Sequence, residues 1–203
     1  FDNINWNDAI KELHKPDNVG NYKNNFYQRL AYDEIFSTFL VNSEIRKKIK
    51  KIKKIKKYLN KKKQIDIIKR LEFSLTNDQI KTLEEINKDL CSSDKMFRLL
   101  QGDVGSGKTI VSLLAAYNTV NSGFQAAVMA PTEILARQHY NLAKNLFPNN
   151  INIELISGKS DYKTKKYILN KLAKSEINII FGTHAIFQKK VTFGNLGLIV
   201  IDE

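Results

Sequence analysis

The sequence is poor in several features that would define a protein class. A single cysteine, Cys91, excludes an internal disulfide and favours a reducing compartment. No apolar run approaches the roughly 20 residues that a transmembrane helix needs, so we expect no membrane partner. The first residues, Phe1-Asp2-Asn3, lack the basic and apolar segments of a signal peptide, and we expect a cytoplasmic location. Because there is no initiator methionine, we expect the sequence to be a fragment.

Acidic residues are missing from one stretch that holds all of the excess positive charge. The net charge is +12, and residues 46–63 contain twelve Lys or Arg and no Asp or Glu. The rest of the chain is balanced, with 21 basic and 21 acidic residues. Apolar residues at helical spacing predict one long amphipathic helix over residues 25–59, which includes most of these lysines. Three interpretations stay open: a track for a nucleic-acid backbone, a membrane-surface helix, or a solvated helix face.

Glycine is also uncommon, but three of the nine glycines stand in Gly102-Asp103-Val104-Gly105-Ser106-Gly107-Lys108-Thr109. This stretch matches the P-loop pattern. Residues 97–101 before it predict a buried strand, and residues 110–117 after it predict a helix. Glycines let backbone N–H groups point inward as an anion nest, which the positive end of the helix also faces. Lys108 offers charge to the β- and γ-phosphates, and Thr109 offers a hydroxyl to Mg²⁺. The alternative is a glycine-rich turn that matches by chance.

From residue 97 onward, strand-like and helix-like segments alternate. The predicted strands are continuous apolar runs, which indicates burial on both faces and a mostly parallel sheet covered by helices. We therefore expect an α/β fold with sites at the carboxyl ends of the strands. Before residue 97 the pattern is helical, and Thr76 with Gln79 predicts a capping box at a helix start. The remaining expected strands are residues 125–130, 151–156, 177–181 and 198–201, and the helices are residues 8–14, 133–147 and 162–174.

Three strand ends carry polar residues that suit phosphate or metal chemistry. Asp202 and Glu203 follow the last predicted strand, as in the Walker B arrangement, where one carboxylate holds Mg²⁺ and its neighbour polarises the attacking water. The alternative is a strand that ends in acidic turn residues. Pro131-Thr132 and Gly182-Thr183-His184 each begin a helix and offer N–H groups and a hydroxyl to a phosphate. Helix capping by Thr is the alternative that local chemistry favours.

Several motifs occur together: Ser74-Leu75-Thr76 with Gln79, Leu99–Thr109, Ala130–Ala136 with Gln138-His139, Gly182–Ala185 and Leu196–Glu203. Together they closely resemble the RecG family of bacterial superfamily 2 DNA helicases, over residues 73–203. The motor of the transcription-repair coupling factor is the next most similar, but it tends to carry Phe in place of Ser106 and Thr in place of Glu133.

The resemblance implies a RecA-like first motor lobe over residues 73–203, truncated at its C-terminal end and preceded by a helical connector over residues 1–72. It implies an ATP-dependent, monomeric translocase that remodels branched double-stranded DNA, namely stalled replication forks and Holliday junctions. Its cofactors would be ATP and Mg²⁺. The wedge domain and the second motor lobe of such a protein, which carries an arginine finger, are expected outside this sequence.

The resemblance also implies roles for individual residues. It assigns Phe73 and Gln79 to the adenine, Gly102, Asp103, Val104, Gly105, Ser106, Gly107, Lys108 and Thr109 to the phosphates, Thr109 and Asp202 to Mg²⁺, and Lys108 and Glu203 to catalysis. It assigns Pro131, Thr132, Gln138, His139, Gly158, Thr183 and His184 to DNA contacts or to coupling.

Two other classes of function remain as alternatives. A small-molecule P-loop kinase would need a lid and an acceptor pocket, and it would leave the Thr motifs at the strand ends without a use. A non-catalytic DNA-binding module would rely on the lysine run and would leave the nucleotide site vestigial. The intact set of Lys108, Thr109, Asp202 and Glu203 argues against the second alternative.

Overall fold

The computed structural model describes residues 4–15, 24–158, 161–188 and 191–202, except for the side chains of residues 49–51. The chain forms two compact units, Phe1–Lys53 and Lys54–Glu203. This division falls within the lysine run, ahead of the predicted boundary between connector and lobe. No helix in the described part of the chain is both long and apolar enough to cross a membrane.

The described residues of the first unit form two helices that pack against each other, α1 (Trp6–Leu13) and α2 (Asn25–Lys51). Asn5 caps α1 through its side chain, which accepts a hydrogen bond from the N–H of Asn7 at 2.9 Å. Ala9 is the α1 residue that is fully buried. Helix α2 is long but ends at Lys51, so the predicted continuation to residue 59 is wrong.

The segment after α2 is not helical because its polar groups bind another helix, α4 (Asn77–Cys91). The backbone N–H groups of Lys54 and Lys57 donate to the carbonyl oxygens of Ser93 (2.8 Å) and Leu90 (3.2 Å). The Lys54 ammonium group donates to the carbonyl oxygens of Asp89 (2.7 Å) and Leu90 (3.1 Å). Asp89 and Leu90 stand in the last turn of α4, where few helical N–H groups remain to bond their carbonyls, and Ser93 lies just beyond it. Two residues of the lysine run therefore serve the fold of the second unit.

Lys57 is the more unusual of these two lysines because it is only 3% exposed. Its ammonium nitrogen lies 4.7 Å from the centroid of the Phe124 ring, a cation–π contact. Gly197 stands beside both, and a Cβ there would come within 2.9 Å of the Lys57 side chain. Burial, and then the positive charge of Lys54, lowers the pKa of Lys57 to about 8.

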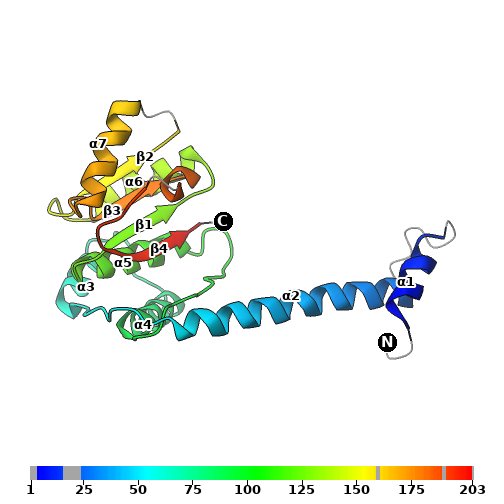
Figure 1. The fold of residues 1–203 in the computed structure, drawn as a ribbon. Helices are drawn as coiled ribbons and strands as arrows, with labels where there is room; N and C mark the ends of the chain where they lie inside the picture. Colours follow the sequence, from blue (N-terminus) through cyan, green and yellow to red (C-terminus); the bar gives the residue numbers. More distant parts are fainter. Residues whose placement is uncertain (1–3, 16–23, 159–160, 189–190, 203) are drawn as a thin grey trace. The chain divides into compact units, whose positions relative to one another are not determined.

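The second unit contains a sheet of four parallel strands in the order β2-β3-β1-β4 (Figure 1). Its strands match the predicted ones to within about two residues, and the α/β class with a parallel sheet is confirmed. The strands are β1 (Gln125–Met129), β2 (Ile153–Ile156), β3 (Ile179–Gly182) and β4 (Leu196–Ile201).

Both faces of the central strands are buried, because alternate side chains of β1 enter two different apolar clusters. Ala126 and Val128 pack with α4, α5 (Lys108–Asn121), α6 (Glu133–Leu146) and α3 (Lys61–Ile68). Ala127 and Met129 pack with α7 (Tyr162–Ala173) and the short helix η2 (His184–Phe187). The expected burial on both faces fails for β4, whose Ile199 and Ile201 are 47% and 64% exposed. Strand β4 lies at the edge of the sheet.

Residues 97–101 do not form the predicted strand. Arg98 is held by α4, since its guanidinium donates to Asp89 (2.8 and 2.9 Å) and to Glu85 (2.7 Å). Phe97 and Leu99 are 70% and 85% exposed. Residues 98–100 and the outer edge of β4 border one cavity of about 300 Å³. A strand requires a paired ladder of hydrogen bonds, and no such pairing is made by these residues in the described part of the chain.

The buried ammonium of Lys57 predicts a pH-dependent change in stability. Between the ordinary lysine pKa of 10.5 and the folded value of about 8, the unfolded chain binds a proton that the folded chain does not. Lys57 therefore lowers the free energy of unfolding as the pH falls through this window, and its full effect is reached below pH 8. We expect Lys57→Met to change the free energy of unfolding, relative to wild type, in the stabilising direction by more at pH 7 than at pH 10.5. Urea unfolding of both proteins at both pH values measures this difference. The exposed neighbour provides the control, and Lys56→Met should show the same difference from wild type at both pH values.

Candidate nucleotide-binding site

The P-loop adopts the conformation that its glycines predict. Gly105 and Gly107 have φ values of +81° and +84°, in the left-handed region where a side chain is strained. Gly107 is the N-cap of α5, so the helix begins at Lys108 and its first N–H groups face the loop. Val104, at the tip, is 98% exposed. The loop thus presents a helix N-terminus and a curled backbone to solvent, an arrangement that binds anions.

The Lys108 ammonium lies across the P-loop. It donates to the carbonyl oxygens of Gly102 at 2.7 Å and Asp103 at 2.9 Å. These contacts hold a positive charge at the point where the nest and the helix end converge. A phosphate is a stronger partner for an ammonium than a neutral carbonyl, because both groups are charged. The Lys108 ammonium can therefore exchange its bonds to these carbonyls for a bond to a bound phosphate at a low cost in free energy.

Gln79 joins the start of α4 to the P-loop. The predicted capping box is present: the Thr76 N–H donates to Oε1 of Gln79 at 3.0 Å, and the Gln79 N–H donates to the Thr76 hydroxyl at 3.3 Å. In addition, Nε2 of Gln79 donates to the Ser106 carbonyl at 2.8 Å. This third bond is absent from the sequence-based prediction. A Cβ at Gly107 would lie 2.4 Å from Nε2 of Gln79, in addition to the strain that its positive φ would impose.

Asp202 is placed by the pairing of the two strands at the open side of the sheet. Its backbone N–H donates to the Met129 carbonyl at 2.9 Å, which continues the ladder of β1 and β4. Its carboxylate oxygen Oδ2 accepts a hydrogen bond from Nε2 of His139 in α6, at 2.7 Å. Asp202 and Lys108 also line the same cavity of about 300 Å³, together with Ser112. The structure therefore brings the two sequence-predicted ends of the site together. Glu203 lies outside the described residues.

The residues at this cavity fit a magnesium ion that arrives with a nucleotide. Asp202 contributes a partly exposed carboxylate to the cavity, and Thr109 stands beside Lys108 at the start of α5 without lining the cavity itself. In the described ranges, no group of three or more His, Cys, Asp or Glu gathers as a metal site. Mg²⁺ commonly takes one or two protein oxygens and completes its shell with phosphates and water. The sparse donor set matches that mode of binding rather than a protein cage.

The two threonine motifs at strand ends differ in what their hydroxyls do. Thr132 caps α6 by accepting a hydrogen bond from the Leu135 N–H at 3.3 Å, as local chemistry predicts. Thr183 precedes η2 without a side-chain cap, and His184 beside it is exposed. The Gly158 carbonyl accepts from the Lys165 ammonium at 3.2 Å.

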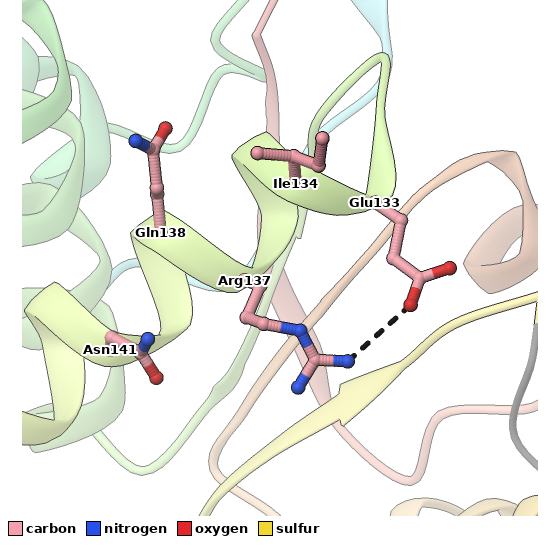
Figure 2. Close-up of a pocket in the computed structure, with 5 residues that line it drawn as sticks. All are labelled: Glu133, Ile134, Arg137, Gln138 and Asn141. Carbon is pink, nitrogen blue, oxygen red and sulfur yellow. Dashed lines mark hydrogen bonds and ion pairs between the residues drawn. The ribbon is translucent and has the colours of Figure 1, made fainter.

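The first half of α6 borders a second hollow, of about 510 Å³ (Figure 2). Glu133 and Arg137 form an ion pair there at 3.4 Å, and Gln138 is directed away from that pair. Pro131 and Thr132, just before α6, are exposed. His139, on the same helix, is instead buried, so the residues predicted to touch DNA do not all share one surface. The hollow is lined by Glu133, Ile134, Arg137, Gln138 and Asn141.

A glycine-rich loop at the start of a helix, a parallel sheet, and a strand-end aspartate that shares a cavity with the lysine of the loop define the nucleotide-binding lobe of a P-loop protein. The family model described as DEAD/DEAH box helicase matches residues 76–203, and the chain belongs to that family.

Among its relatives are proteins named ATP-dependent DNA helicase RecG, so the resemblance to RecG is confirmed. The one from Aquifex aeolicus is 42% identical over 206 residues, which cover 96% of this chain and 25% of the relative. The one from Thermotoga maritima is 44% identical over 177 residues, which cover 87% and 23%. The chain thus spans about a quarter of the length of these relatives.

Solved structures agree with this assignment. The structure of RecG bound to a three-way DNA junction matches with a TM-score of 0.78 and 41% identity, over 97% of this chain and 27% of that one. A hypothetical ATP-dependent RNA helicase from Sulfolobus tokodaii matches with a TM-score of 0.53 and 20% identity, over 71% of this chain and 41% of that one. The second likeness is evidence for the fold alone.

Lys108 predicts a direct loss of nucleotide affinity. Lys108→Ala removes a charge-assisted contact to phosphate worth about 1.5–3 kcal/mol, so ATP binding should weaken about 10–100-fold. Titration with a fluorescent ATP analogue measures the change. Lys88→Ala, which removes an exposed lysine on α4, is the matched control and should bind as wild type does. Equal affinities for Lys108→Ala and wild type would contradict the phosphate site.

Proposed function

We propose that this chain is the ATP-binding motor lobe of a RecG-type translocase that remodels branched double-stranded DNA. The observation that carries the proposal is the placement of Lys108 and Asp202 on one cavity in a chain that is about 40% identical to RecG helicases. The relative with the TM-score of 0.78 is bound to a three-way DNA junction. The proposal for this chain is therefore stalled replication forks and Holliday junctions as substrates, with the protein acting as a monomer.

The nucleotide chemistry is assigned to the residues around the P-loop. The loop N–H groups and Lys108 bind the β- and γ-phosphates, while Thr109 and Asp202 hold Mg²⁺. A metal held there would supply positive charge to the phosphates during hydrolysis. Glu203, which follows Asp202 directly, is proposed to orient and polarise the attacking water.

Adenine recognition is assigned to Gln79 and the half-exposed Phe73. The Gln79 amide already bonds Thr76 and Ser106 through its oxygen and nitrogen. An adenine that engages this amide must share or replace those bonds. We therefore propose that adenine binding alters the hydrogen bond between Gln79 and the Ser106 carbonyl, and thereby the P-loop backbone.

DNA binding is assigned to the strand-end motifs and α6. Pro131 and Thr132 are exposed just before α6, and Gln138 is exposed on α6, whereas Gly158, Thr183 and His184 follow other strands of the same sheet. Free N–H groups and hydroxyls at such positions suit a phosphate backbone. A second motor lobe and a wedge domain in the remainder of the protein are proposed to complete the ATP site and to split the junction.

The complete gene product tests the proposal. Wild type should hydrolyse ATP many-fold faster with a model replication fork than without DNA, and Lys108→Ala should be inactive in both cases, because nucleotide no longer binds productively. A coupled phosphate-release assay measures both rates. Linear duplex DNA of the same total length, which has no branch, serves as the control substrate for branch recognition. An ATP hydrolysis rate that is the same with and without DNA would refute the translocase assignment and favour a kinase-like function instead.

The 203-residue chain by itself should be a poor ATPase. An arginine finger from a second lobe contributes about 10³–10⁵ in rate, so the isolated chain should bind Mg·ATP yet turn it over at least about 10³-fold more slowly than the complete protein. Single-turnover hydrolysis with excess chain measures the rate. Turnover similar to that of the complete protein would show that this lobe needs no partner lobe.

A further inference from the structure

His139 is the described residue whose environment differs most from its expected role. The sequence places it in a motif assigned to DNA contacts or coupling, yet its side chain is only 10% exposed. Its Nε2 atom lies 2.7 Å from Oδ2 of Asp202, 63 residues further along the chain. The exposed residues of α6, including Ile134 and Gln138, belong to a different face of the helix.

We propose that His139 is a positioning residue that orients the Asp202 carboxylate for Mg²⁺. This inference rests on the proposed nucleotide function and names a residue that acts on the metal through another. Asp202 acts as the acceptor, so the bond requires a proton on Nε2 of His139. That bond occupies Oδ2 and leaves Oδ1 of the same carboxylate for a ligand.

The physical reason is that, among the described residues, His139 alone bonds the Asp202 carboxylate. Its backbone is held by the β1 ladder, but its side chain is 31% exposed at the end of an edge strand. A carboxylate in that position has several rotamers, and only some of them point an oxygen at a metal. A short hydrogen bond from a buried ring selects one rotamer before the ion arrives. Loss of such outer partners typically lowers metal affinity or activity 10–100-fold.

The burial of His139 makes it suitable for this task. A neighbouring turn of α6 contributes Ala136 and Ala143 to the interior, so the ring projects from the face of the helix that packs inward. Helix α6 begins immediately after β1, and β1 pairs with β4. The donor and the acceptor are therefore attached to neighbouring strands of one sheet, which fixes their separation more firmly than two loops could.

Mg²⁺ titrations at a fixed concentration of a fluorescent ATP analogue, using the full chain, test the inference. His139→Leu fills the space without a donor and should raise the Mg²⁺ concentration at half-saturation about 10–100-fold. His139→Gln keeps an N–H donor at similar reach and should recover most of that loss. Asn145→Leu, on an exposed position of the same helix, is the matched control and should titrate as wild type does. Binding of the analogue in EDTA should be equal in all four proteins.

A double-mutant cycle separates positioning from a general effect on the fold. In the Asp202→Ala background, His139→Leu should change the Mg²⁺ dependence no further, because the carboxylate it orients is gone. An undiminished effect in that background overturns the inference, as does an equal loss of affinity with and without Mg²⁺, or a failure of His139→Gln to recover any binding. If wild type binds no Mg·ATP at all, the nucleotide site itself is refuted. Wild-type binding that is indifferent to His139 refutes only the positioning role.

Discussion

The parallel pairing of β1 with β4 is the constraint on which the nucleotide site depends. It aligns Met129 with Ile201 and thereby places Asp202 at the same end of the sheet from which α6 departs. The P-loop helix α5 packs against both strands, which brings Lys108 to the same cavity. A shift of one residue in this register would turn Asp202 to the other face of the sheet, because side chains alternate along a strand. Lys108 and Asp202 would then no longer share a cavity.

The edge position of β4 has a second consequence. One of its edges pairs with β1, while the strand also borders a cavity shared with residues 98–100, and its Ile199 and Ile201 are partly exposed. An unpaired apolar edge exposes backbone groups that favour pairing with another strand. The chain covers about a quarter of the length of its RecG relatives from Aquifex aeolicus and Thermotoga maritima.

Polar groups also hold the lobe together, through hydrogen bonds that hydrophobic periodicity does not predict. Lys54 satisfies the last carbonyls of α4, and Gln79 binds both its own helix start and the P-loop. Gln125, only 2% exposed, donates to the carbonyl oxygens of Leu172 and Ile177 and accepts from the Asn195 N–H. Buried polar groups are costly unless they are paired, so such contacts specify one arrangement of neighbouring segments. Helix α7, β1 and the segment before β4 are joined in this way.

Local sequence predicted most elements of the second unit, since their determinants lie within a few residues of one another. Gly105 and Gly107 adopt the left-handed backbone that the P-loop motif implies, Thr76 and Thr132 cap their helices, and the apolar runs of β1 and β3 are buried. The motifs were sufficient to predict a P-loop α/β lobe and its likeness to RecG. These features need only the chain's own dihedral preferences, short hydrogen bonds and hydrophobic periodicity.

Contacts between distant segments decided the features that the local sequence pattern does not predict. Helix α2 ends at Lys51 although its apolar spacing continues, because the following backbone pairs with α4. The apolar residues 97–101 form no strand, because a strand exists only where a second strand pairs with it. The bond between His139 and Asp202 joins residues 63 positions apart, and no local signal distinguishes a histidine that turns inward from one that faces DNA. The sequence alone therefore predicted which residues form the site, and the packing of distant segments determined which of the described ones touch.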